Sequence, residues 1–226
     1  MENRINNETS GDINETVVAG AGELNQSRPR RKDKEKSVKS EAFAWVRDIA
    51  IAVVAALLIS RIITPTIVQE HSMEDTLQNH NYLILLRTAY KFGSEPQYGD
   101  IVVFQSDLVN EENGKDKLLI KRVIAKGGDT VAIRDGVVSR NGEALDEPYT
   151  KDGYTNGAMD ETVVPDGSLF LCGDNRLVSL DSRSEQVGFV EEERLIGKAV
   201  FRLFPFNEIG SVYKNMTESE GTAEDL

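Results

Sequence analysis

The sequence predicts a mainly β protein with one N-terminal transmembrane helix followed by an antiparallel β domain. A mostly apolar stretch runs from Phe43 to Ile63, and about 20 such residues are needed to span a bilayer. After it, short runs rich in β-branched and aromatic residues alternate with Gly, Asn and Asp turns, and no long stretch has helical periodicity. With 226 residues, 39% of them hydrophobic, the chain is long enough for one medium-sized domain with appendages.

The segments before the helix differ in composition. Residues 1–27 are rich in Asn, Glu, Thr and Gly, and we expect a disordered tail because they cannot bury a core. Residues 28–41 form a basic segment, and we place the transmembrane helix at 42–63, with Trp45 at the interface. The charges near the helix ends can reach the polar headgroups. The basic side chains are Arg28, Arg30, Arg31, Lys32, Lys34, Lys36 and Lys39.

The basic segment also predicts the orientation. By the positive-inside rule the N-terminus is cytoplasmic, so residues 64–213 form an extracytoplasmic β domain of a single-pass protein and residues 214–226 an acidic tail. A buried helix of a soluble protein is the alternative, disfavoured by the Lys and Arg residues just upstream. A cleaved secretory signal is disfavoured because no small-x-small site follows closely and the leader would be unusually long.

The β domain is predicted from apolar runs separated by turn signals. Asp135-Gly136 lies between two such runs and is a two-residue hairpin signal, and Asn141-Gly142 indicates the next turn. Residues 149–161 indicate a loop, and Pro65 is expected to end the helix. The predicted strands are 82–86, 101–104, 118–124, 130–134, 137–140, 168–172 and 198–204.

Composition excludes several classes of function. The net charge of −12 argues against nucleic acid as a partner. Cys172 is the only cysteine and stands in an apolar run, so we expect a core residue rather than a reactive thiol. The two histidines, His71 and His80, are too few for a dedicated zinc site, and we predict no metal or cofactor. His71 precedes Ser72 directly, and neighbours on an extended segment point to opposite faces, which disfavours a Ser-His-Asp triad.

A serine and a lysine carry the candidate chemistry. Ser72 follows the apolar stretch closely, and Lys121 ends the strand-like run 117–120. A serine beside a neutral lysine can act as a nucleophile without histidine. The reference pKa of lysine is about 10.4, so Lys121 must be buried among its apolar neighbours to be neutral. The alternative is a surface lysine on a strand edge.

Four segments carry a resemblance to a known family. Residues 72–77, Ser-Met-Glu-Asp-Thr-Leu, resemble the Ser-Met-x-Pro-Thr-Leu box of bacterial type I signal peptidases, peptidase family S26. Residues 98–104 resemble the family's Gly-Asp-Ile-Val box, and residues 120–124, followed by Gly-Asp, its lysine box. Residues 173–183 resemble the last box. The boxes occur in the family's order and extend from the helix to about residue 204.

The resemblance implies a catalytic β domain of the signal peptidase type. It implies that Ser72 attacks the scissile carbonyl, that Lys121 is the general base, and that Ser179 hydrogen-bonds and orients the lysine. The activity implied is that of a serine endopeptidase that removes N-terminal signal peptides from exported preproteins at the outer face of the cytoplasmic membrane. The implied partners are these signal peptides, membrane lipid and the protein export machinery.

The resemblance also implies an ion pair that supports the site, and two positions of this sequence differ from the family pattern. Asp181 is expected to pair with an arginine, either Arg183 or Arg122. Asp75 stands where the family has proline, and Glu70 stands where some relatives have a serine or glycine near the oxyanion hole. We expect the Glu70 side chain to turn away, which leaves the Ser72 backbone N–H as the main donor.

An extended peptide can add to an exposed sheet edge, and small pockets would select small residues at positions −1 and −3. Two other classes of protein stay open. One is a non-catalytic, membrane-anchored β domain that binds exported proteins. The other is a Ser/Lys self-cleaving regulator, which would carry a DNA-binding domain instead of a membrane helix.

Overall fold

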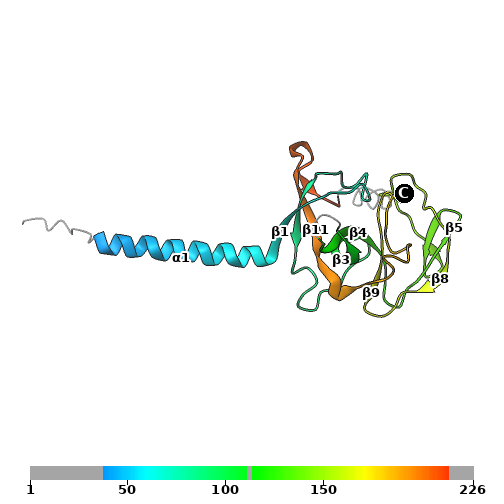
Figure 1. Ribbon diagram of the computed structural model, residues 1–226, viewed down its shortest axis with the longest axis horizontal. Helices are drawn as coiled ribbons and strands as arrows, with labels where there is room; N and C mark the ends of the chain where they lie inside the picture. The colour runs from blue at the N-terminus through cyan, green and yellow to red at the C-terminus, as the bar shows by residue number, and fades with distance from the viewer. Residues whose placement is uncertain (1–37, 111–113, 214–226) are drawn as a thin grey trace, which may run out of the picture. The chain divides into compact units, whose positions relative to one another are not determined.

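The computed structural model describes residues 38–110 and 114–213, with side chains from Glu41 onward. One α-helix, α1, spans Val38–Ile62 (Figure 1). Val38–Val46 belongs to one compact unit, and the unit that begins at Arg47 holds the rest of α1 and every strand. The predicted tails 1–27 and 214–226, and residues 28–37 of the basic segment, lie outside the described residues.

Helix α1 has the composition of a membrane span. Its apolar part, Glu41–Ile62, has 22 residues, and none of it is buried against protein. Glu41 in the first turn and Arg61 in the last turn suit the helix dipole. Arg47 pairs with Asp48 at 2.8 Å between Nη2 and Oδ1, which lowers the cost of placing these two charges near a membrane.

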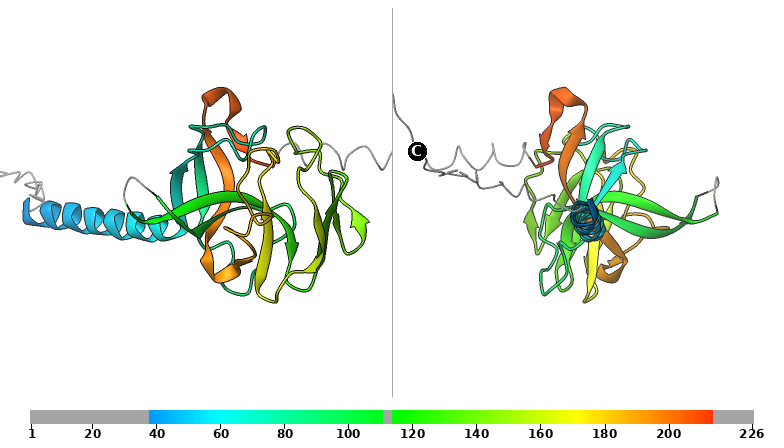
Figure 2. Two further views of the ribbon diagram at one scale, coloured as in Figure 1. Left: turned by 45° about the vertical axis from the view of Figure 1, so that its right-hand side comes forward. Right: turned by 90° about the vertical axis from the view of Figure 1, so that its left-hand side faces the viewer.

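The larger sheet is antiparallel, in the order β1-β2-β11-β3-β4-β9-β10, with β12 paired to β11. Strand β4 pairs with β3 along most of its length but with β9 only from Arg122 onward. Figure 2 shows β3 and β4 extending together as a two-stranded arm. The strands are β1 Ile63–Ile67, β2 Tyr82–Leu86, β3 Ile101–Val109, β4 Asp116–Lys126, β9 Ser168–Cys172, β10 Val190–Glu191, β11 Leu195–Phe204 and β12 Gly210–Ser211.

The smaller sheet has the order β7-β6-β5-β8 and is also antiparallel. Its central hairpin turns at Asp135 and Gly136, which both have positive φ, 51° and 83°, as a type I′ turn requires. Its strands are β5 Thr130–Arg134, β6 Val137–Arg140, β7 Glu143–Ala144 and β8 Met159–Val163. Two 3-10 turns, η1 Glu192–Arg194 and η2 Phe206–Glu208, flank β11.

The mainly antiparallel β class is confirmed, and four predicted strands, 82–86, 130–134, 137–140 and 168–172, have the observed bounds. Two corrections concern edge strands. The predicted loop 149–161 is wrong for its last three residues, which begin β8, a mostly polar strand at a sheet edge. Pro65 does not end the helix: α1 ends at Ile62, and Pro65 lies in edge strand β1, where its missing N–H is tolerated.

The apolar core anchors the segment that follows Ser72. Met73 and Leu77, which follow Ser72, are fully buried in one apolar cluster with Leu83, Leu85 and Ile101. A second cluster joins the two sheets around Ile124, Phe170 and Cys172, and a third lies around Phe104 and Val123. Cys172 is a core residue as predicted, and burial raises the pKa of its thiol.

Candidate active site

Ser72 and Lys121 meet in the interior of the β domain. The Nζ of Lys121 lies 2.7 Å from the Oγ of Ser72 across a sequence separation of 49 residues. Strand β4 positions the lysine by pairing with Val102 of β3, and the buried side chain of Met73, the next residue, anchors the turn that carries the serine. Lys121 is 0% exposed, which excludes the surface-lysine alternative.

The turn that carries Ser72 is attached to the segment after β9. The Asn175 backbone N–H donates to the Ser72 carbonyl at 3.0 Å, and the Asn175 side-chain amide donates to the His71 carbonyl at 3.2 Å. Glu74 bonds the ring of His71 at 2.6 Å and the ammonium of Lys151 at 2.8 Å. The bond from Lys151 and that from His71 lower the pKa of Glu74. His71 is exposed and its ring contacts Glu74, whereas Ser72 is buried in a turn and not in the extended segment that the prediction assumed.

The surroundings of Lys121 favour its neutral form. Burial lowers the pKa of its amine, because a charge is poorly solvated in the interior. Glu70, Asp181 and Cys172 oppose this shift, yet the pKa remains lowered. Both carboxylates are paired with other cations, Glu70 with Lys117 and Asp181 with Arg183. The amine therefore has a hydroxyl partner and no carboxylate ion-pair partner among the described residues.

Ser179 packs against Gly173, which also lies against the Ser72 carbonyl, and does not make the predicted hydrogen bond to Lys121. Its buried Oγ forms no hydrogen bond within residues 38–110 and 114–213, so the predicted bond to Lys121 is not made. A Cβ built on Gly173 would lie 2.2 Å from Ser179 Oγ and 2.4 Å from the Ser72 carbonyl oxygen. The three residues are therefore packed against one another, and only glycine fits at position 173.

Asp181 pairs with Arg183, which decides between the two predicted partners. The arginine Nε and Nη2 donate to the two carboxylate oxygens at 2.8 and 2.9 Å. The backbone N–H of Gly173 donates to the same carboxylate at 2.9 Å. Although burial would raise the pKa of Asp181, these bonds and the charge of Arg183 lower it, with a contribution from nearby Ser179. The pair therefore fixes the segment that carries Gly173 and Ser179.

Arg122 binds Asp174 instead. Its Nε and Nη2 donate to the two Asp174 oxygens at 2.8 and 2.6 Å, and its Nη1 donates to the Gly99 carbonyl at 2.9 Å. The guanidinium also lies 4.0 Å from the ring centroid of Tyr149. Burial opposes the charged form, but Asp174 raises the pKa of Arg122. One cation thus connects β4, the Gly99 turn and the segment after β9.

Sequence reasoning gave no role to Arg176, although it lies inside the last box. The fully buried Arg176 forms a two-pronged pair with Glu147 at 2.8 and 2.6 Å and donates to the Gly173 carbonyl at 2.9 Å. Its presence in the box was a signal, but Glu147 lies in a turn 29 residues upstream and nothing in the local sequence identifies it. Arg176 thus holds the carbonyl of Gly173, as Asp181 holds its N–H.

A groove of about 900 Å³ is lined by the two segments that precede Ser72 and Lys121 in the sequence. One wall is Pro65–Glu70, which ends two residues before Ser72. The other wall is residues 115–120 of the arm, which ends immediately before Lys121. No described strand pairs with the β4 edge over residues 116–121, because β9 begins to pair at Arg122. One wall therefore begins in strand β1, and the other lies along β4, which has an open edge there.

Asp75 of the serine box and Glu70, two residues before Ser72, are the positions that depart from the family pattern. Asp75 is exposed on the surface. The Glu70 side chain turns into the groove and forms an ion pair with Lys117 on the facing wall. The Glu70 carboxylate is therefore held by Lys117, although it remains near enough to Lys121 to raise the pKa of that amine.

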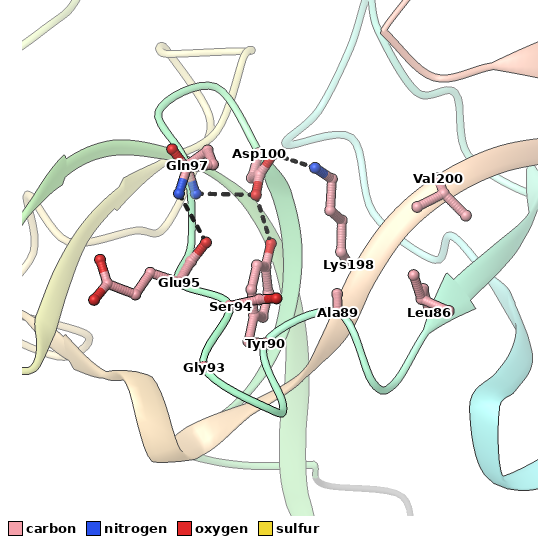
Figure 3. A pocket seen from close by; sticks show the side chains of 10 residues that line it. All are labelled: Leu86, Ala89, Tyr90, Gly93, Ser94, Glu95, Gln97, Asp100, Lys198 and Val200. Atoms are coloured by element: carbon pink, nitrogen blue, oxygen red, sulfur yellow. Dashed lines mark hydrogen bonds and ion pairs between the residues drawn. The ribbon is translucent and has the colours of Figure 1, made fainter.

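A second cavity, of about 610 Å³, lies under the loop between β2 and β3 (Figure 3). Asp100 at its base accepts from Tyr90 at 2.9 Å and from the Gln97 N–H at 3.0 Å, and it pairs with Lys198 at 2.5 Å. These groups bond one another, which fits a role in holding the loop. In the described part of the chain, no three His, Cys, Asp or Glu side chains gather as a metal site.

Comparison with known proteins identifies the family of the chain. The family model of signal peptidase, peptidase S26, matches residues 42–204. Signal peptidase I of Bacillus licheniformis is 35% identical over 187 residues, covering 78% of this chain and 96% of that protein. Signal peptidase I S of Bacillus subtilis (strain 168) is 35% identical over 189 residues, covering 79% and 97%.

A solved structure of a signal peptidase I from Enterococcus faecalis V583 is 31% identical, covers 46% of this chain and 97% of that chain, and superposes with a TM-score of 0.37. The family match includes α1 from residue 42 onward, both groove walls, the serine and lysine segments and the last box. With a helix, a β domain and a buried Ser72–Lys121 contact in the matched region, the chain belongs to the signal peptidase family, peptidase S26.

Proposed function

We propose that Ser72 is the nucleophile and Lys121 the general base of a signal peptidase I. The chain is a serine endopeptidase of family S26, and the activity of this family is the removal of signal peptides from exported preproteins. The observation that carries the proposal for the two residues is the buried 2.7 Å contact between Lys121 Nζ and Ser72 Oγ. Hydrogen-bond reach and a lowered base pKa are the two conditions for this chemistry.

In the proposed mechanism the neutral Lys121 amine takes the Ser72 hydroxyl proton as Oγ attacks the scissile carbonyl. The resulting ammonium gives that proton to the leaving amine, and an acyl-enzyme remains on Ser72. A water molecule, deprotonated by the same amine, then hydrolyses the ester and restores the serine. The Ser72 backbone N–H donates to no protein acceptor within the described residues, which leaves it available for the developing oxyanion.

Ser179 is proposed to orient the Lys121 amine once substrate is bound. Its hydroxyl is buried, unbonded within the described chain and packed beside Gly173 and the Ser72 carbonyl. A hydroxyl can accept from or donate to an amine without adding charge, so it can hold the base without raising its pKa. Catalytic hydrogen bonds are often absent in free enzymes and form in the substrate complex. Asp181, Arg183 and Arg122 are proposed to support the site through the ion pairs described above.

The signal peptide is proposed to bind as an extended strand in the groove. The backbone N–H and C=O of Val68 both point toward residues 80–81 of the same chain. The N–H donates to the Asn81 carbonyl at 3.0 Å, and the C=O accepts from the His80 N–H at 2.8 Å. Because backbone groups alternate along an extended segment, those of Gln69 point the other way, toward the groove. The open β4 edge faces them, so a peptide between the walls can pair with backbone on both sides.

The enzyme is membrane-anchored by α1, and we propose a single-pass topology with the N-terminus in the cytoplasm. The basic segment before α1 supports this orientation. The proposed partners are the signal peptides of exported preproteins, membrane lipid around α1 and the protein export machinery. Protease added to wall-stripped cells is expected to digest residues 64–213 and to spare the residues before α1. The reverse pattern contradicts this topology.

The test of the reaction uses the full chain in detergent. Purified protein is incubated with a preprotein that has small residues at positions −1 and −3, and the products are identified by mass spectrometry. We expect one cut after position −1, with a rate that rises with pH through the pKa of Lys121, because only the neutral amine accepts a proton. Binding without cleavage would instead support the non-catalytic alternative.

A further inference from the structure

The Glu70–Lys117 ion pair connects the two walls of the substrate groove. Glu70 ends the wall that leads to Ser72, and Lys117 lies on β4, the wall that leads to Lys121. A carboxylate oxygen of Glu70 contacts the ammonium of Lys117. Strands β1 and β4 are separated by β2, β11 and β3 in the sheet, so this contact runs across the opening between them and not along a strand pair.

A peptide that lies between these walls must pass the ion pair. No described strand pairs with the β4 edge over residues 116–121, and both charged residues line the same space. We propose that the cross-groove ion pair, Glu70–Lys117, closes the groove in the free enzyme and that a preprotein must separate it to reach Ser72. The proposal rests on the signal peptidase function proposed above.

The exposure of the pair suits this role. The side chains of Glu70 and Lys117 are 33% and 40% exposed, so each ion is partly hydrated after separation. Ion pairs of this exposure are weak and are screened by salt. A peptide that forms strand hydrogen bonds in the groove can therefore displace the contact, whereas the fully buried Arg122–Asp174 pair could not open in this way.

The pair also places two charges near the base. Lys121 has four charged or titratable neighbours: Glu70 from the segment before Ser72, Lys117 from β4, Cys172 from β9 and Asp181 from the segment after β9. Glu70 raises the pKa of Lys121, and Lys117 lowers it. Removing either residue should therefore open the groove. In contrast, removing Glu70 should lower the pKa of Lys121 and removing Lys117 should raise it, so the two effects can be measured separately.

The experiment measures cleavage of a signal-peptide substrate by the full chain in detergent for Glu70→Gln and for Lys117→Gln. We expect KM to fall by about twofold to fivefold in each variant, the range that corresponds to one partly exposed ion pair. The reversed pair, Glu70→Lys with Lys117→Glu, is expected to restore a KM near that of the original enzyme. Raising the salt concentration should lower KM in the original enzyme and have a smaller effect in the two single variants.

The pH profile gives the second readout. Glu70→Gln removes a charge that raises the Lys121 pKa, so the acidic limb of kcat/KM is expected to move to lower pH. Lys117→Gln should move it to higher pH. Arg194→Gln is the matched control, because it breaks the ion pair with Asp107 outside the groove. It should change neither KM nor the pH at which the acidic limb of kcat/KM occurs.

Binding distinguishes failure of this proposal from failure of the proposed function. The dissociation constant of the same peptide is measured by fluorescence anisotropy with Ser72→Ala present in every variant, so the result does not depend on hydrolysis. Tighter binding in both single variants supports the cross-groove role. A dissociation constant or KM that rises or stays unchanged in either Glu70→Gln or Lys117→Gln overturns it.

Discussion

Two neighbouring basic residues on β4, Lys121 and Arg122, are both fully buried, 0% and 1% exposed, and their pKa values are shifted in opposite directions. Successive strand residues point to opposite faces, so the two side chains enter different surroundings. Lys121 meets a serine hydroxyl, and burial lowers its pKa. Arg122 meets the Asp174 carboxylate, which raises its pKa. Burial alone therefore does not decide whether a side chain is a base or a structural ion; the placing of carboxylates does.

The largest expected effect comes from removing either member of the Ser72–Lys121 pair. Ser72→Ala and Lys121→Met should each reduce preprotein cleavage by about 10⁴-fold or more, as in other nucleophile–base pairs. Lys121→Arg should fail as well, because a guanidinium stays protonated. The assay is product formation by mass spectrometry, with membrane association checked in parallel.

Lys126→Met is the control on the same strand, because its ammonium lies over the ring of Tyr98 and away from Ser72. It should leave most of the activity in place. Cleavage at more than a few per cent of the normal rate in Ser72→Ala or Lys121→Met would refute the assignment of the pair.

The second-largest effect tests the buried ion pair between Arg122 and Asp174. Asp174→Asn leaves Arg122 buried without a carboxylate and should lower the free energy of unfolding by about 3–5 kcal/mol. Urea unfolding measures the change, and activity should fall only as far as the folded fraction falls. Asp107→Asn, which removes the partner of the more exposed Arg194, should have little effect on stability. Equal losses in both variants would contradict the contrast between buried and exposed pairs.

The third effect comes from filling the space beside Ser72. Gly173→Ala would bring a methyl group within 2.2 Å of Ser179 Oγ and 2.4 Å of the Ser72 carbonyl oxygen, so the nucleophile must shift. A shift of this kind costs about 100-fold in rate. The measurement is kcat together with the melting temperature, and a variant with normal kcat would show that Ser72 tolerates displacement.

The smallest effect separates two serines of the last box. Ser179→Ala should lower kcat by about tenfold, as expected for a group that positions the base, with little change in stability because its hydroxyl is unbonded within the described chain. Ser182→Ala should do the reverse, since the Ser182 hydroxyl accepts the Leu171 N–H at 3.0 Å. Identical behaviour of the two variants would remove Ser179 from the proposed mechanism.

How much the sequence could predict depended on burial. Strands such as Ser168–Cys172, buried at every residue, are continuous apolar runs and were predicted with the observed bounds. Strand β8 was missed because it is short, polar and at an edge, and its residues are fixed by pairing with β5. β1 was missed because its residues continue the apolar stretch of the helix.

Some residues of the site could be predicted from the sequence, and others could not. The family boxes identified Ser72, Lys121 and the last box, although spacing alone could not bring residues 49 apart into contact. The partner of Asp181 stayed open between two arginines, because a choice of partner depends on which face each side chain occupies. Glu147 and Lys117 were not predicted as partners of Arg176 and Glu70, since these contacts join distant segments of the chain.

The open edge of β4 has a consequence beyond substrate binding. A strand edge that is free to pair with a peptide is equally free to pair with another copy of the same strand, which is how sheets begin to aggregate. The edge carries Lys115, Asp116 and Lys117 at its outer end, and charges at such positions discourage self-association. The same residues that border the groove therefore also help to keep neighbouring molecules apart in a crowded membrane.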